Sequence, residues 1–134
     1  MKQSTRKLVV GAVIVALGLS SFAISRTYAK ADTSAIADVM GKIFKGDKKK
    51  KIDAIVVKAQ NGKATAEEIK TLQEQLKLLA AEKPPKGEQA AWDKRTAALI
   101  AAADSVAKGD AAGAKALKEA ANCKTCHEAH QKKD

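Results

Sequence analysis

Apolar residues recur every three or four positions along most of this chain, a spacing that places them on one face of an α-helix. The clearest run follows the capping-box pattern of residues 65–68 and comprises Ile69, Leu72, Leu76 and Leu79. The pair Pro84-Pro85 cannot continue a helix, so the pattern predicts a helix that ends near Glu82.

Three other runs have the same spacing. The first stops before Gly46-Asp47 and includes Ile36, Val39, Met40, Ile43 and Phe44. A short second run stops at Asn61-Gly62 and includes Ile52, Ile55, Val56 and Ala59. The third stops before Gly109 and includes Trp92, Thr96, Leu99, Ala103 and Val106. Because no strand pattern occurs, the sequence predicts an all-α fold, an antiparallel four-helix bundle with an extra short or broken N-terminal helix.

The last predicted helix begins behind Asp110, a favourable N-cap residue. Its inward stripe, counted in steps of three and four, is predicted to be Gly113, Ala116, Ala120, Cys123 and His127. Cys123-Lys-Thr-Cys126-His127 has the C-x-x-C-H spacing of a covalent c-type haem attachment site. Two thiols at this spacing can each add to a haem vinyl group, and the adjacent imidazole can coordinate the iron.

Other interpretations of the two cysteines fit less well. A thioredoxin-like C-x-x-C pair normally accompanies a βαβ pattern, and none is present in this sequence. A structural zinc site needs four protein ligands. The chain contains only two Cys and two His, and the two His are His127 at the end of the motif and His130 after it. A disulfide between such close neighbours would stabilise the fold little, because the loop it closes is short.

The N-terminus has the layout of a secretory signal peptide. A basic head precedes an apolar run over residues 8–19, and cleavage is predicted after Ala29 or Ala31. Residues 1–31 are therefore predicted to be a signal peptide, and residues 32–134 the single domain of an exported, periplasmic protein. An uncleaved anchor is the alternative, although the apolar run is short for a membrane span.

Composition adds two restrictions. The 134-residue chain has a net charge of +10, and loss of residues 1–31 removes five basic residues and no acid, leaving +5. This moderate charge and an aromatic content of 3% argue against nucleic-acid binding. After cleavage Phe44 and Trp92 are the only aromatic residues, and the abundant alanines bury little area each. A large apolar cofactor such as haem would complete this core.

Residues 33–134 resemble the class II c-type cytochromes, the cytochrome c′ family. The resemblance rests on the C-x-x-C-H motif near the C-terminus, the helices before it and a methionine in the first helix. It implies one haem c attached at Cys123 and Cys126, with His127 as the proximal iron ligand. Met40 is the single methionine after cleavage, and its place on the first helix resembles that of the distal iron ligand in the low-spin, methionine-ligated branch of the family. Core filling is the alternative role for Met40.

Two further residues near the expected haem have predicted positions. His130 follows His127 on the proximal side, where a surface or propionate-contacting role is expected. Trp92 is expected to pack in the core or at the haem edge. The lysine run of residues 48–51 is either a docking surface or a solvated face.

These observations together predict a monohaem carrier of single electrons between redox partner proteins, and not an enzyme. Lys124, Lys132 and Lys133 flank the attachment site and could steer an acidic partner. Stable membrane insertion is not expected after signal cleavage, and the family resemblance allows a homodimer. The alternatives are a pentacoordinate, high-spin protein that binds NO or CO, and a haem-free exported helical interaction protein.

Overall fold

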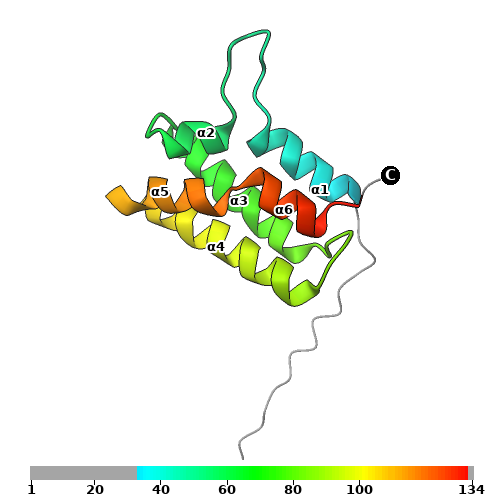
Figure 1. Cartoon of the computed structure of the whole chain (residues 1–134). Coiled ribbons are helices and arrows are strands. Elements are labelled where there is room, and N and C mark those ends of the chain that lie inside the picture. The colour runs from blue at the N-terminus through cyan, green and yellow to red at the C-terminus, as the bar shows by residue number, and fades with distance from the viewer. Residues whose placement is uncertain (1–32, 133–134) are drawn as a thin grey trace, which may run out of the picture.

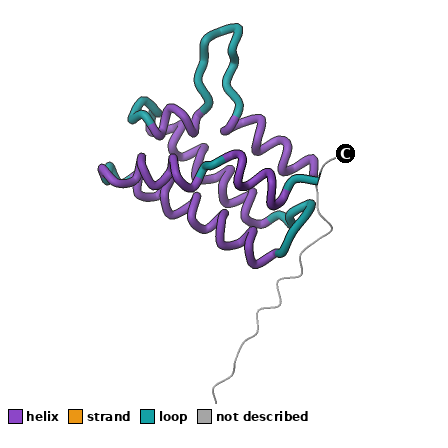
Figure 2. Tube along the Cα trace, in the orientation of Figure 1, coloured by secondary structure: helices purple, strands orange, loops and turns teal. Residues whose placement is uncertain are grey.

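The computed structural model describes residues 33–132, and the predicted signal peptide lies outside these described residues, as does Lys133. Helices make up most of this range and it contains no β-strand, which confirms the all-α prediction (Figure 2). None of the described helices is long and apolar enough to cross a lipid bilayer.

Four helical segments lie side by side and alternate in direction along the chain (Figure 1). The elements are α1 (Thr33–Val39), the π-helix η1 (Met40–Phe44), α2 (Ile55–Gln60), α3 (Ala66–Ala81), α4 (Gln89–Ala107), α5 (Ala111–Ala120) and α6 (Cys123–His130). The first segment is α1 continued by η1, the second and third are α3 and α4, and the fourth is α5 followed by α6. Helix α2 is the extra short helix, and it packs against η1, α3 and α5.

Local sequence signals set the limits of α3. The Thr65 hydroxyl accepts a hydrogen bond from the Glu68 amide at 3.2 Å, and the Glu68 carboxylate accepts one from the Thr65 amide at 3.0 Å. This is the predicted capping box, which satisfies two amides that a helix start leaves without partners. The helix ends at Ala81, and Glu82 is already extended.

The core lies where α3 and α4 face η1, α2 and α5. On η1, α2, α3 and α4 most of the buried positions have the predicted spacing. Ile52, predicted to begin the short second run, is instead 49% exposed in the loop before α2. The fully buried large side chains are Ile43, Leu72, Leu76, Leu79 and Leu117.

The prediction of one continuous last helix is wrong. The chain leaves helical geometry at Ala121 and Asn122, and the Asn122 side chain accepts a hydrogen bond from the Thr125 amide at 3.2 Å, which caps α6. Within α5 the buried residues are Gly113 and Leu117, whereas Ala116 of the predicted stripe is exposed. Asparagine is among the best N-cap residues, and this signal could have located the break from the sequence.

Candidate functional site

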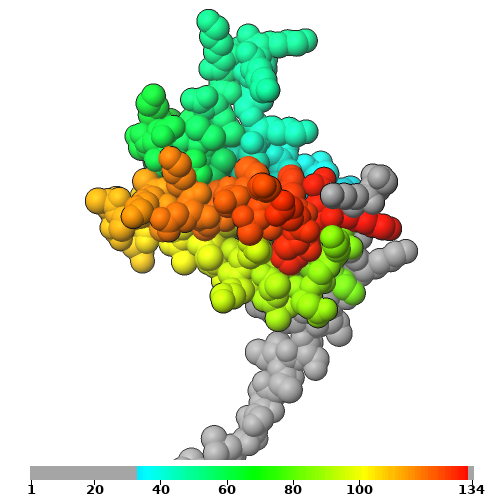
Figure 3. All heavy atoms as spheres, viewed as in Figure 1, coloured from blue at the N-terminus to red at the C-terminus, as the bar shows by residue number. Residues whose placement is uncertain are grey.

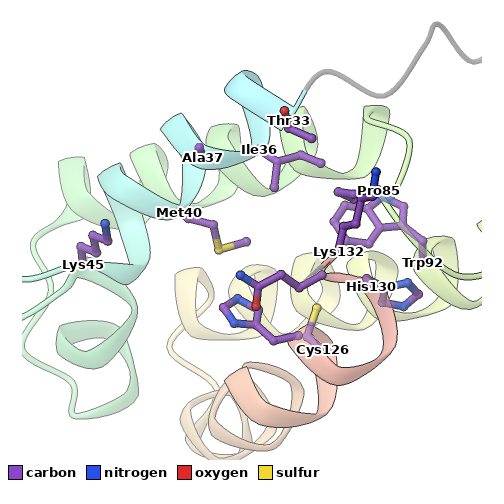
Figure 4. Close-up of a pocket in the computed structure, with 12 residues that line it drawn as sticks. Thr33, Ile36, Ala37, Met40, Lys45, Pro85, Trp92, Cys126, His130 and Lys132 are labelled. Carbon is purple, nitrogen blue, oxygen red and sulfur yellow. The ribbon is translucent and has the colours of Figure 1, made fainter. Parts of the chain in front are cut away.

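A hollow separates α6 from the first helical segment (Figure 4). It has an outer lobe of about 500 Å³ and an inner lobe of about 200 Å³. The two lobes adjoin, because the same five residues line both: Met40, Lys45, Trp92, Cys126 and His127. The outer lobe alone is within the size range of small-molecule and cofactor sites, roughly 300–1,000 Å³.

The α6 wall of the hollow carries the C-x-x-C-H motif. Cys123, Cys126 and His127 all line the inner lobe, so the first turn of α6 presents both thiols and the imidazole on one side. Both cysteines are free thiols. Cys123 and His127 are exposed and Cys126 is half-buried, so these residues border an open space and do not continue the close-packed stripe predicted for the last helix.

Met40 lies on the opposite wall. Its thioether points toward α6 in Figure 4, and the residue lines both lobes. The neighbouring positions Val39 and Ile43 are buried in the core, whereas Met40 is half-buried and packs against that core while it lines the hollow. Met40 also begins η1, and π-helical turns within α-helices frequently occur at functional sites. The sequence predicted the apolar stripe but gave no sign of the π-helix.

The four residues singled out from the sequence therefore surround one space. Cys123, Cys126, His127 and Met40 line the inner lobe together, although Met40 is distant in sequence from the other three. The rest of that lobe is mainly apolar, with Phe44, Leu79, Trp92 and Leu99 in its walls. A flat apolar ligand could lie here in contact with the thiols on one side and the thioether on the other.

The two thiols have different environments. Burial raises the pKa of the Cys126 thiol, the positive charge of Arg95 opposes this effect, and the neighbouring Cys123 adds to it. Cys126 is accordingly held as a neutral thiol at neutral pH. Cys123 is exposed, and its Sγ lies 3.7 Å from the Ala121 carbonyl oxygen.

Basic side chains rim the hollow. Lys45 lines both lobes, Arg95 the inner lobe and Lys132 the outer lobe, and no acidic residue of the described chain lines either lobe. This charge favours a ligand with anionic groups, as the propionate groups of a haem are. Periodicity did not single out Lys45 or Arg95 as site residues, because nothing in the local sequence marks which basic side chains border a cavity.

His130 is buried, and the prediction that it lies at the surface is wrong. It is 3% exposed, and its ring meets the Trp92 ring edge-to-face with centroids 5.3 Å apart. Its Nδ1 lies 3.2 Å from the Lys86 carbonyl oxygen, in the turn between α3 and α4. That turn approaches closely because Gly87 has a φ of 84°, and a Cβ there would lie 2.7 Å from the Ala129 carbonyl oxygen. The core position predicted for Trp92 is confirmed, at 2% exposed.

Two buried polar atoms near the outer lobe have no hydrogen-bond partner. They are Trp92 Nε1 and His130 Nε2, and both residues line that lobe. Because a carbonyl oxygen can only accept, the Lys86 contact assigns the proton of a neutral His130 to Nδ1 and leaves Nε2 as an acceptor. Buried polar groups usually have a hydrogen-bond partner, which for these two atoms ordered water or a bound group can supply.

The residues around the hollow fit a covalently attached haem. They supply two free thiols and an imidazole from α6, a thioether from η1, apolar walls and a cationic rim. Within residues 33–132 no three Cys, His, Asp or Glu side chains converge as a metal site. A haem iron has no need of one, since the porphyrin leaves only one or two positions for protein ligands.

Comparisons of this chain with protein-family models, with curated proteins and with solved structures gave no match. A helical bundle hosts many unrelated functions, so the function has to be inferred from the residues of the hollow.

Proposed function

We propose that this chain is an exported c-type cytochrome of the class II type that carries one electron at a time. The observation that carries the proposal is the opposition of Met40 to the C-x-x-C-H motif of α6 across one hollow. Thioether bonds at Cys123 and Cys126 would hold the haem, and His127 and Met40 would coordinate its iron. When bound, the haem supplies the chemistry, the gain and loss of one electron at the iron.

The surrounding residues have definable roles in this proposal. Leu79, Trp92 and Leu99 are buried and keep water from one side of the inner lobe, which limits the reorganisation that a change of charge requires. Met40 as distal ligand would raise the reduction potential and suit an electron carrier. Lys45 and Lys132, exposed at the rim, would favour haem carboxylates and an acidic partner protein.

Export is part of the proposal because c-type haem is attached outside the cytoplasm. Its support is the signal-peptide pattern of residues 1–31, with a basic head, an apolar run and small residues at the cleavage point. Release from the membrane after cleavage and a periplasmic location follow from that pattern.

Mass spectrometry under denaturing conditions tests the attachment. The wild-type protein should retain one haem mass, and the double variant Cys123→Ala, Cys126→Ala should lose it. Thr125→Ala, which changes the same turn of α6 and keeps both thiols, is the matched control and should retain the haem. A wild-type protein without the added mass would contradict the proposal and favour a haem-free helical interaction protein.

Absorption spectroscopy tests the distal ligand. The wild-type ferric protein should be low-spin, and Met40→Ala should become high-spin because the thioether is lost. Ile36→Ala is the control, since Ile36 lines the outer lobe from the same helical segment but cannot coordinate iron. A high-spin wild-type spectrum would contradict Met40 ligation and favour the pentacoordinate protein that binds NO or CO.

A further inference from the structure

The loop between η1 and α2 projects from the bundle and carries concentrated positive charge. Lys48, Lys49, Lys50 and Lys51 follow one another and are all exposed. The loop stands clear of the helices in Figure 1, and in the space-filling view its long side chains spread from the tip (Figure 3). We refer to residues 47–52 as the lysine loop.

Specific contacts hold the lysine loop in shape. Asp47 and Ile52 pair across its base, with N–O distances of 2.8 and 2.9 Å. The Asp47 carboxylate also accepts hydrogen bonds from the amides of Lys49 and Lys50, at 3.0 and 3.1 Å. At Gly46 a Cβ would collide with the Ile52 carbonyl oxygen, so only glycine lets the two legs approach this closely. The loop is therefore a defined turn that presents four lysines together.

The folded chain itself gains little from this arrangement. Lys51 has a φ of 55°, a left-handed conformation that is unfavourable for residues other than glycine. Among the described residues, the one ion pair in the loop joins Lys50 to Asp47 at 3.7 Å, so the charge of the other three lysines is not balanced there. Ile52 is 49% exposed beside them. Local strain, like-charge repulsion and an exposed apolar side chain at one place are typical of a surface that a partner covers.

We propose that the lysine loop docks the protein reversibly onto an anionic lipid surface. Four to eight basic residues in a short segment are the usual size of a cluster that recognises anionic lipid headgroups. Lysine suits such diffuse charge, because its ammonium is a point charge on a flexible stem, whereas arginine suits planar, bidentate partners. Ile52 and the methylene stems of the lysines can contact the interface while the ammonium groups remain among the headgroups.

The shape and composition of the loop favour a lipid surface over other anionic partners. A projecting tip can meet a flat surface without a clash from the helices behind it. The lysine loop contains no arginine and no aromatic residue, which argues against nucleic acid. Lys45, just before the loop, lines both lobes of the hollow, so a docked loop would hold the rim of the hollow near the surface. The docking does not depend on the proposed haem.

Co-sedimentation of the full chain with lipid vesicles tests the proposal. Vesicles of phosphatidylcholine with phosphatidylglycerol should bind the protein, whereas vesicles of phosphatidylcholine alone should not, and added salt should release it. Replacing Lys48–Lys51 with glutamine should lower the partition coefficient about a hundredfold to a thousandfold. Circular dichroism of the helices checks that the variant is folded.

The matched control neutralises four exposed lysines on three helices, Lys70, Lys77, Lys94 and Lys115, and has the same net charge. It should retain most of the binding, since those lysines do not form one cluster. Equal loss in both variants would overturn the proposal, because net charge alone would then account for binding. The proposal would also be overturned if the wild-type protein did not bind phosphatidylglycerol vesicles. The same holds if the lysine loop were required only for binding an acidic polypeptide such as polyglutamate. The N-terminal segment, with its own basic residues, is common to all variants, so the difference between the two lysine variants measures the contribution of the lysine loop alone.

Discussion

The α3–α4 side of the bundle and the side where α6 faces the first helical segment are packed very differently. On the α3–α4 side Leu72, Leu76, Leu79, Trp92 and Leu99 are all buried, and the last three also form part of the wall of the hollow. On the other side, half-buried Met40 and Cys126 and exposed Cys123 and His127 border a hollow. The first side is filled by its own side chains, whereas the second has a hollow that the side chains around it leave open.

Side-chain size explains the difference. The two helices of the packed side bring leucines and a tryptophan to their interface, and each such side chain removes much apolar surface from water. The sequence of α6, Cys-Lys-Thr-Cys-His-Glu-Ala-His, contains no large aliphatic residue. Its one buried residue, His130, serves to fasten the end of the helix to the α3–α4 turn. The chain thus fixes the position of α6 without filling the space beneath it.

The largest expected effect is on the packed side. Leu76→Ala, at a residue 1% exposed, should lower the free energy of unfolding by about 3 kcal/mol, because the core cannot close the resulting cavity. Leu78→Ala, on the same helix at a residue 54% exposed, should change it by less than about 0.5 kcal/mol. Urea unfolding of the two variants measures both values, and equal losses would show that α3 is not packed as described.

The next largest effect is expected where the α3–α4 turn contacts α6. Gly87→Ala should lower the free energy of unfolding by about 2 kcal/mol, because it strains a residue with a φ of 84° and displaces the Ala129 carbonyl of α6. Gly109→Ala has a similar φ, 73°, with nothing within 4 Å, so it should cost only about 1 kcal/mol. Urea unfolding of the pair isolates the contact with α6, and indistinguishable values would mean that the contact does not stabilise the fold.

Within the open side, the two thiols should react at different rates. In haem-free protein at neutral pH, iodoacetamide should modify Cys123 about tenfold faster than Cys126, since Cys123 is exposed and burial raises the pKa of Cys126. Mass spectrometry of the single variants Cys123→Ala and Cys126→Ala gives the two rates. Arg95→Gln should slow Cys126 further, because the arginine charge lowers the pKa of that thiol. Similar rates for both thiols would contradict the burial of Cys126.

The smallest effect concerns the pH dependence of the packed side. The Lys58 ammonium, 2.6 Å away, and the Thr65 amide lower the pKa of Glu68 by hydrogen bonding. Because the pKa of Glu68 is lower in the folded state, the ionised carboxylate stabilises the fold above the unfolded pKa. This stabilisation is lost as the pH falls through the folded pKa. Glu68→Gln should therefore be less stable than wild type at neutral pH, and the difference should shrink in acid. Urea midpoints of both proteins, measured from neutral pH into acid, give this difference. Glu74 is an exposed acid of the same helix, and Glu74→Gln is expected to show no such trend.

The predictions that held depend on residues close together in the chain. The capping box of Thr65 and Glu68, the cap at Asp110 and the spacing of the leucines of α3 are local, and the structure contains all of them. The break at Asn122 was also local, but the apolar spacing of α5 runs through it and concealed it. The haem attachment remains a proposal, although its motif could be recognised from five consecutive residues.

The sequence alone determined most of the helices, most of their buried faces and the candidate motif. Hydrogen bonds within a helix and side-chain periodicity involve residues only a few positions apart. Tertiary structure decided that Met40 faces the motif across a hollow, since residues far apart in the chain meet only when the bundle closes. It also decided that His130 is buried against Trp92, because Gly87 allows the α3–α4 turn to reach it. Burial and cavities depend on which distant side chains arrive at a place and how large they are, and no local pattern records that.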